Sequence, residues 1–201
     1  MTERLTAQDW IDLAAATLAR EGFDALKADV LARKLGVSRG SFYWHFADLG
    51  AFHLRVIEHW RQTTTEAIIA DIERHDSRAR RLDALLRRAF GHGAALEVRM
   101  RAWADANPTA ARAVADVDRR RRDYLEQLLV EAGVARPLAA TRAQLLYWTY
   151  LGAASSRIRH AAERLDGIVA ELERLALAGT ADDPDGKPSQ RHHLSKKSRQ
   201  S

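Results

Sequence analysis

Apolar residues recur three and four positions apart along most of the chain, which is the spacing of one face of an α-helix. No stretch alternates apolar and polar residues in the manner of a strand, and no internal repeat is visible. Glycines, prolines and capping residues divide the pattern into successive segments. The sequence therefore predicts an all-α protein, with helices at about 6–21, 28–35, 39–46, 49–72, 78–90, 94–106, 108–132, 137–156 and 160–177.

Two short helices around a tight turn are predicted between residues 28 and 46. The first helix carries an apolar stripe and ends at Gly36, because glycine enters the left-handed conformation of a helix C-cap without strain. Ser38 stands where its side chain can cap the second helix. Val37 and Phe42 can close a small core between the two helices. This is the pattern of a helix-turn-helix, whose second helix lies in the major groove of DNA.

The composition of the second helix suits contact with DNA. Phe42 and Phe46 are four residues apart and point to one side, which leaves polar residues for the other faces. Arg39 is a candidate for bidentate recognition of guanine, and Gly40 allows the backbone to approach a groove edge or a phosphate closely. An ordinary helical hairpin with an aromatic core is the alternative. The other donors, suited to bases or phosphate oxygens, are Ser41, Tyr43 and His45.

The run Gly36-Val37-Ser38-Arg39-Gly40-Ser41-Phe42-Tyr43-Trp44-His45-Phe46 resembles the DNA-binding motif of the tetracycline-repressor (TetR) family of transcriptional regulators. In that family, a Gly-Val-Ser-x-Gly-x-Leu-Tyr-x-His-Phe run forms the turn and the recognition helix. The resemblance is strong over about residues 6–62 and extends beyond them only in helical layout. One departure is Leu49, which stands where the family usually has a lysine that meets a phosphate.

The resemblance implies a three-helix DNA-binding domain (1–48) and a helical ligand-binding and dimerisation domain (49–178), linked by a shared helix (49–72). It also implies a homodimer that represses from a palindromic DNA operator and is released by a small hydrophobic or aromatic ligand. A DNA-binding regulator or architectural protein without such a ligand is the alternative. The DNA-binding residues that we expect are Lys27, Ser38, Arg39, Gly40, Ser41, Tyr43, Trp44 and His45.

The second domain holds candidates for a ligand pocket and for a dimer interface. Aromatic residues gather in it, and they suit a hydrophobic pocket, a core or an interface. The last two helices carry an apolar stripe too wide for a marginal surface helix, which favours a self-complementary interface. The predicted pocket residues are Met100, Trp103, Tyr124 and Tyr147. The predicted interface residues are Leu146, Tyr150, Ala154, Leu165, Ile168 and Leu172.

Four consecutive arginines, residues 119–122, fall in the middle of a predicted helix. Because four consecutive residues point all round a helix, at least one of them faces inward or towards a partner. A solvated face with ion pairs at helical spacing is one interpretation, and a nucleic-acid patch is another. An inward arginine close to a ligand is the third.

Composition narrows the function further. The chain has 201 residues, 46% of them hydrophobic, and a formal net charge of +5, which is compatible with nucleic acid. It has no cysteine, which excludes disulfides and thiolate metal sites. No apolar run reaches membrane-spanning length and the N-terminus has no signal-peptide pattern, so we expect a cytoplasmic protein with no membrane partner. Residues 179–201 have almost nothing to bury and are predicted to form a disordered tail.

Patterns typical of enzymes are missing from the sequence. There is no nucleophile-elbow glycine pattern, no His-Glu-x-x-His zinc helix and no glycine-rich phosphate loop. The pair His192-His193 has no third ligand at a useful spacing, so no metal site is predicted. We therefore predict no catalytic residues and no cofactor, and a helical enzyme is the least favoured class.

Overall fold

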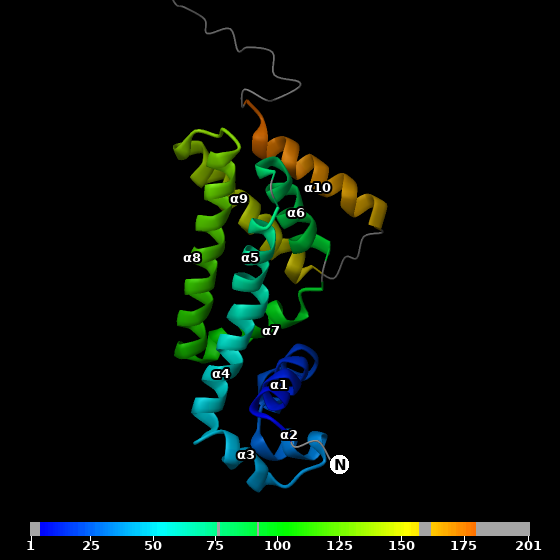
Figure 1. The fold of residues 1–201 in the computed structure, drawn as a ribbon, viewed down its shortest axis with the longest axis vertical. Helices are drawn as coiled ribbons and strands as arrows, with labels where there is room; N and C mark the ends of the chain where they lie inside the picture. Colours follow the sequence, from blue (N-terminus) through cyan, green and yellow to red (C-terminus); the bar gives the residue numbers. More distant parts are fainter. Residues whose placement is uncertain (1–4, 76, 92, 157–161, 180–201) are drawn as a thin grey trace, which may run out of the picture.

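The computed structural model describes residues 5–75, 77–91, 93–156 and 162–179, and these form helices and their connections (Figure 1). The predicted all-α class is confirmed. Most of the predicted tail, together with His92, His192 and His193, lies outside the described residues. The elements are α1 (Ala7–Glu21), the 3-10 turn η1 (Phe23–Ala25), α2 (Ala28–Leu35), α3 (Arg39–His45), α4 (Leu49–Arg61), the π-helical turn η2 (Gln62–Glu66), α5 (Ala67–Glu73), α6 (Arg78–Gly91), α7 (Ala95–Ala106), α8 (Pro108–Glu131), α9 (Arg136–Ser155) and α10 (Ala162–Leu177).

Local sequence accounts for where the first helices begin and end. Thr6 and Asp9 form the predicted capping box of α1: the Asp9 amide donates to the Thr6 hydroxyl, and the Thr6 amide donates to the Asp9 carboxylate at 2.6 Å. Gly22 ends α1 with a φ of +89°, and Gly36 ends α2 with a φ of +69°. Both values lie in the region that favours glycine, so these two positions fix the breaks around α2.

The long helix that we predicted over residues 49–72 is interrupted by one wider turn. α4 and α5 are joined by the π-helical turn η2, and together they form a continuous rod over residues 49–73 (Figure 1). The hydroxyl of Thr63 donates to the His59 carbonyl at 2.8 Å, and that of Thr64 donates to the Trp60 carbonyl at 2.7 Å. Such back-bonding competes with the regular helical ladder, and π-turns inside helices frequently mark functional sites.

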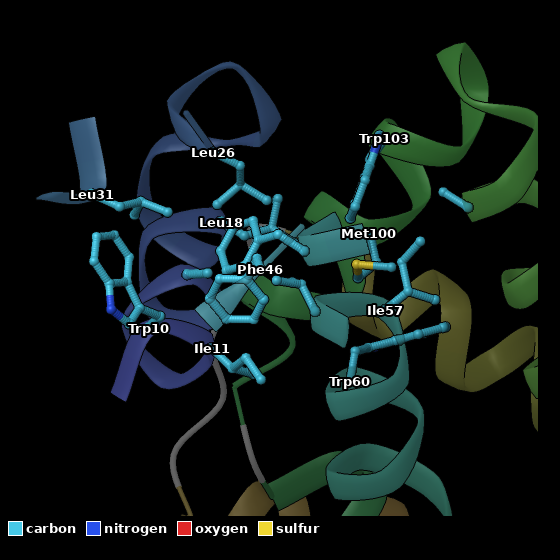
Figure 2. Close-up of a cluster of buried hydrophobic side chains, with 14 of the residues drawn as sticks. Trp10, Ile11, Leu18, Leu26, Leu31, Phe46, Ile57, Trp60, Met100 and Trp103 are labelled. Atoms are coloured by element: carbon cyan, nitrogen blue, oxygen red, sulfur yellow. The ribbon is translucent and has the colours of Figure 1, made fainter. Parts of the chain in front are cut away.

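One hydrophobic core, here called the N-terminal cluster, packs the helix-turn-helix against α1, α4, α7 and the first half of α8 (Figure 2). Rings fill much of it: Trp10 meets Phe42 edge-on with ring centroids 5.4 Å apart, and Phe23 stacks on Trp103 at 4.5 Å. α7 and α8 follow the helix-turn-helix in sequence by more than fifty residues. The end of the molecule that holds the helix-turn-helix therefore includes helices that the sequence assigned to the second domain.

A second core, the C-terminal cluster, joins α6, α9 and α10 to the second half of α8 at the other end of the molecule (Figure 1). α10 packs chiefly on α6. Its Leu165 lies close to Gly91, the last residue of α6. The rod runs between the two ends, and its α5 portion packs on α6 and α8 through Ile69 and Ile72. Changes at the C-terminal end thus have a mechanical route to α4. No helix within the described ranges is long and apolar enough to span a membrane.

Candidate DNA-binding surface and ligand cavity

The turn between α2 and α3 has the geometry that the sequence predicted. The Gly36 amide donates to the carbonyls of Ala32 and Arg33, and the Val37 amide donates to the Ala32 carbonyl at 3.0 Å. These bonds close the end of α2 and turn the chain into α3. Ser38 occupies the N-cap position, but its side chain makes no capping hydrogen bond within the described part of the chain. The predicted side-chain cap is therefore wrong. The backbone carbonyl of Ser38 instead accepts a hydrogen bond from the Ser41 amide at 3.0 Å.

The helix α3 has one face in the core and the opposite face in solvent. Phe42 and Phe46 are 0% and 4% exposed, as their spacing predicted. Tyr43 and Trp44 are 50% and 84% exposed, although both are large aromatic residues. Burying such side chains is normally favourable, so their exposure marks this face as an interaction surface. Of the other expected contact residues on α3 and its turn, Ser38, Arg39 and Gly40 are exposed, and Ser41 and His45 are half-buried.

The side chain of Arg39 lies along α3 against Tyr43. One of its terminal nitrogens donates to the Tyr43 hydroxyl at 3.0 Å, and the guanidinium carbon lies 5.7 Å from the centre of the Tyr43 ring. This contact holds the guanidinium beside Tyr43 on the exposed face without neutralising its charge. The two residues to which we assigned separate roles therefore form one unit in the free protein.

Residues around α3 complete the exposed surface. Lys27 is exposed at the N-cap position of α2. Lys34, by contrast, forms an ion pair with Glu21 of α1. Leu49 is 37% exposed at the first position of α4, directly after Asp48, whose carboxylate caps the helix by accepting from the Ala51 amide at 2.7 Å. The place where the TetR family usually has a lysine is thus on the surface here and uncharged.

A cavity of about 250 Å³ lies beside the π-turn, between the rod, α6, α7, α8 and α9. Most of its wall is apolar, with polar groups gathered on one side. Tyr124 and Tyr147 line it, as the sequence predicted for a pocket. The apolar lining includes Ile68, Ile69, Leu85, Leu86, Phe90, Leu96, Leu125 and Leu146. The polar lining includes Thr63, Thr64, Thr65, Arg88, Glu97, Arg121 and Tyr150.

Two of the four predicted pocket residues do not line the cavity. Met100 and Trp103 are 0% and 2% exposed in the N-terminal cluster, on the face of α7 that packs against α1 and α4 (Figure 2). The prediction was wrong for them because α7 presents different residues, Leu96 and Glu97, to the cavity. An aromatic-rich composition could not distinguish the two faces of this helix.

Two of the predicted interface residues also face inward. Leu146 is 6% exposed, and Tyr150 packs on the C-terminal cluster; both line the cavity. The half-buried positions are Ala154, Leu165, Ile168 and Leu172. The apolar side chains that α9 leaves in solvent are Leu138, Leu145 and Trp148, which are 45%, 54% and 61% exposed. With the exposed Gly152, these residues recur at helical spacing, and we call them the outer face of α9.

Two charged residues of the cavity lining, Glu97 and Arg121, form a charge network with Arg101 and Asp118, which lie behind them outside the lining. The Glu97 side chain is 4% exposed and accepts from both arginines, from Arg101 Nε at 2.9 Å and from the terminal nitrogens of Arg121 at 3.0 and 3.1 Å. Arg101 also donates to the Asp118 carboxylate at 2.5 and 3.1 Å. The hydroxyl of Tyr147 donates to Asp118 at 2.6 Å. Two carboxylates and two guanidinium groups thus balance one another.

Burial and pairing shift the pKa values in the charge network in ways that fix its charges at neutral pH. Burial disfavours the Asp118 anion, but hydrogen bonds from Arg101 and Tyr147 outweigh it and hold the pKa of that carboxyl below its ordinary value. Burial also disfavours the charged form of Arg121, yet the neighbouring Glu97 carboxylate leaves its pKa raised. Burial raises the pKa of Tyr147, so its hydroxyl remains a hydrogen-bond donor.

Arg121 also holds the π-turn. Its Nε donates to the Thr65 hydroxyl at 2.9 Å, and a terminal nitrogen lies 3.2 Å from the Thr64 carbonyl and 3.1 Å from the Thr64 hydroxyl. Its guanidinium carbon lies 5.7 Å from the ring centre of Trp60, which belongs to the N-terminal cluster. Of the interpretations of the arginine run, the inward arginine beside a cavity thus describes Arg121. The other three arginines of the run contact Asp116, Glu66 and Gln144.

A turn that joins two short helices, the second with an exposed polar face, defines a helix-turn-helix DNA-binding protein. The family model "Bacterial regulatory proteins, tetR family" matches residues 11–48, which contain this motif. By this match, the chain carries the DNA-binding domain of a TetR-family transcriptional regulator. No curated protein matches the chain.

Solved structures share the fold over nearly the whole chain. A transcriptional regulator from Rhodococcus sp. Rha1 is 20% identical with a TM-score of 0.72, covering 88% of this chain and 98% of that one. A protein described as a transcriptional regulator from Saccharomonospora viridis, in complex with choline, is 14% identical with a TM-score of 0.66, covering 82% and 93%. FadR from Bacillus subtilis, in complex with stearoyl-CoA, is 14% identical with a TM-score of 0.62, covering 87% and 99%.

Proposed function

We propose that this regulator is a repressor that binds a palindromic operator as a homodimer and leaves it when a small, mainly apolar ligand fills the cavity. The observation that carries the proposal is the position of the rod. Its first helix, α4, packs in the N-terminal cluster beside α3, and its π-turn and α5 form a wall of the cavity. One continuous element therefore links the surface suited to DNA with the space suited to a ligand.

The exposed face of α3 would enter the major groove. Arg39 offers a forked pair of donors for a guanine edge, and its contact with Tyr43 restrains it before DNA is bound. Trp44, 84% exposed, offers an apolar surface for a thymine methyl group. Lys27 at the start of α2 would contact a phosphate.

The outer face of α9 would form the dimer interface. A two-fold dimer needs one self-complementary patch, and this face presents a row of exposed apolar side chains centred on Leu145 and Trp148. Its small Gly152 would allow the partner helix to approach closely. The dimer would present two α3 helices to half-sites in successive major grooves, about one helical turn apart.

The ligand part of the proposal rests on the cavity and is supported by the related folds. The Saccharomonospora viridis protein was solved with choline and the Bacillus subtilis FadR with stearoyl-CoA, so this fold carries ligands of different kinds. Ligand pockets are typically concave and mostly apolar with a few polar groups, as is this cavity. A ligand can release DNA only if it binds better to the form in which the two α3 helices are misplaced.

Selection of bound duplexes from random DNA tests the proposal. We expect one enriched palindrome whose half-sites are about 10 base pairs apart, bound at least ~1000-fold more tightly than unrelated DNA. Enrichment of single half-sites would contradict the dimer, and no enrichment would contradict sequence-specific binding.

Two exposed tryptophans provide matched variants that separate the two surfaces. Trp148→Glu should give a folded monomer on sedimentation, with weak operator binding, because it places a charge in the proposed interface. Trp44→Glu should remain a dimer and lose operator binding, because it places an anion against the DNA. A dimer that persists in the Trp148→Glu protein would move the interface elsewhere.

A further inference from the structure

The charge network limits the kind of ligand that the cavity accepts. Glu97 and Asp118 carry two negative charges, and Arg101 and Arg121 carry two positive charges, so the network is neutral as a whole. Every one of these groups is paired, and Glu97 and Arg121 are 4% and 12% exposed. Arg88, the remaining charged residue of the lining, also has an interaction partner. An additional charge beside this network would therefore meet no unpaired counter-ion in it.

Charge balance makes an uncharged ligand the favoured occupant. Taking an ion out of water is costly unless it gains an opposite charge in return. A carboxylate would have to compete with Glu97 for Arg121, and an ammonium group would have to compete with two arginines for Glu97. A neutral ligand meets neither obstacle and gains from the apolar wall.

The volume and the donors of the cavity describe the ligand further. A cavity of 150 Å³ holds benzene, so about 250 Å³ corresponds to roughly ten non-hydrogen atoms. Arg121 presents only donors to this space, and two of its acceptors, the carbonyl and hydroxyl of Thr64, are neutral. Hydrogen bonds to neutral acceptors are weaker than those to a carboxylate. An acceptor on the ligand would thus replace Thr64 more readily than Glu97.

We infer that the cavity selects an uncharged, mainly apolar ligand whose hydrogen-bond acceptor takes the place of Thr64 on Arg121, and that the release of Thr64 loosens the π-turn η2. The inference rests on the proposed function, because it specifies the ligand and the regulation of that cavity. Arg121 is suited to the second role by its contacts with the cavity lining, with η2 and with Trp60 of α4. With Thr64 released and only Thr65 still bound to Arg121, the loosened turn lets α4 tilt relative to α5.

Isosteric probes test the ligand class on the full chain by titration calorimetry. Octanamide, octanoate and octylammonium each have an unbranched chain of eight carbon atoms and nearly the same size, and they differ in charge. Octanamide should bind at least about tenfold more tightly than either ion, since each ion lacks a buried partner. Tighter binding of either ion overturns the inference. Failure of octanamide to bind at about 10 mM also overturns it, because a ligand of ten non-hydrogen atoms reaches a Kd of about 10 mM with a modest binding free energy per atom.

Two variants, each of which removes one negative charge from the network, extend this test. Glu97→Gln and Asp118→Asn each leave one arginine charge in excess while preserving shape. In both, the affinity of octanoate relative to octanamide should rise by about tenfold or more. Asp118 is 25% exposed, so its variant decides the matter if the Glu97 variant does not fold. An unchanged ratio overturns the inference.

A neighbouring pair of arginines tests the coupling. Saturating octanamide should lower the operator affinity of the wild type by about 5–150-fold. The effect should fall below about threefold in Arg121→Gln and remain in the control Arg120→Gln. The Arg120 side chain is 43% exposed, contacts η2 at Glu66 and lies with its guanidinium carbon 6.0 Å from the centre of the Tyr124 ring. Equal release in both variants overturns the role of Arg121. A wild type that binds no selected duplex would instead refute the proposed function, whereas one that binds the duplex but ignores octanamide refutes this inference alone.

Discussion

The two ends of the molecule are packed differently. The N-terminal cluster is filled with stacked and edge-on rings, and its large side chains, such as Trp10 and Phe42, are completely buried. The C-terminal end borders a cavity, and two charged residues of its lining, Glu97 and Arg121, belong to a network of four charged groups. A tightly packed core resists deformation, whereas a cavity beside paired charges can rearrange when it is occupied. The comparison indicates that the DNA-binding end is built to stay rigid and the cavity end to respond.

The rod, which lies between the two ends, is a regular helix in one part and irregular in another. The part of the rod in the N-terminal cluster is a regular helix with Phe52 and Trp60 fully buried. The part at the cavity departs from the α-helix at η2, where Arg121 supplies hydrogen bonds from outside the rod. The π-turn η2 therefore lies between the part of the rod in the N-terminal cluster and the part beside the cavity.

Truncating one aromatic ring at each end should give the largest difference between the two ends, measured as loss in the free energy of unfolding. Phe42→Ala should reduce the free energy of unfolding by about 3–5 kcal/mol, because it opens a hole in a filled core. Phe90→Ala should cost clearly less, about 1–3 kcal/mol, because Phe90 is half-buried and already borders the cavity. Urea unfolding of both variants measures the difference. Equal losses would mean that the two ends are packed alike.

Removal of the base-reading fork should affect recognition and leave the fold intact. Arg39→Ala should weaken operator binding by ~10-fold and relax the preference at one base pair, because a bidentate contact to guanine is lost. Tyr43→Phe removes the hydroxyl that holds Arg39 and should weaken binding less. Repeating the duplex selection with each variant checks this. An unchanged selected site in Arg39→Ala would assign base recognition to another residue.

A lysine at the start of α4 should restore a contact that the chain lacks. Leu49→Lys should tighten binding to any duplex and steepen the salt dependence by roughly one phosphate for each subunit. The expected gain is a few-fold at moderate salt, and it should be the same for the operator and for unrelated DNA. Titrations at several salt concentrations measure the slope. A slope that stays the same would show that residue 49 does not face the DNA backbone.

Acid should weaken the charge network. The pKa of Asp118 is lowered in the folded protein, so its pairing contributes stability above the ordinary pKa near 3.8, and that contribution is lost as the pH falls below it. The difference in stability between the wild type and Asp118→Asn should therefore be largest at neutral pH and shrink below pH ~4. The control Asp116→Asn, at an exposed ion pair, should differ little from the wild type at any pH.

Local chemistry made the DNA-binding end predictable. The breaks at Gly22 and Gly36 and the burial of Phe42 and Phe46 depend on backbone conformation and spacing within a few residues. The cavity end depends on which faces of distant helices meet, and here composition misled. Met100 and Trp103 pack in the N-terminal cluster, because α7 turns that face towards α1.

The π-turn could not be predicted from its own residues. Three threonines in a row indicate a poor helix former, but the wider turn is held by Arg121, which lies 56 residues beyond Thr65. The sequence did contain one signal, since four consecutive arginines cannot all face solvent. Which of them turned inward depended on Glu97, a residue that the sequence did not single out.

Hydrogen exchange at residues 62–66, with and without a selected operator, tests most directly whether the two ends are coupled through the rod. These residues belong to η2 and line the cavity in part, and they lie far along the rod from α3. If DNA favours the form in which Arg121 holds the turn, their protection should rise by about 5–150-fold in the complex. Protection that rises only in α1–α4, with no change at 62–66, would contradict the coupling of the cavity to the DNA-binding surface.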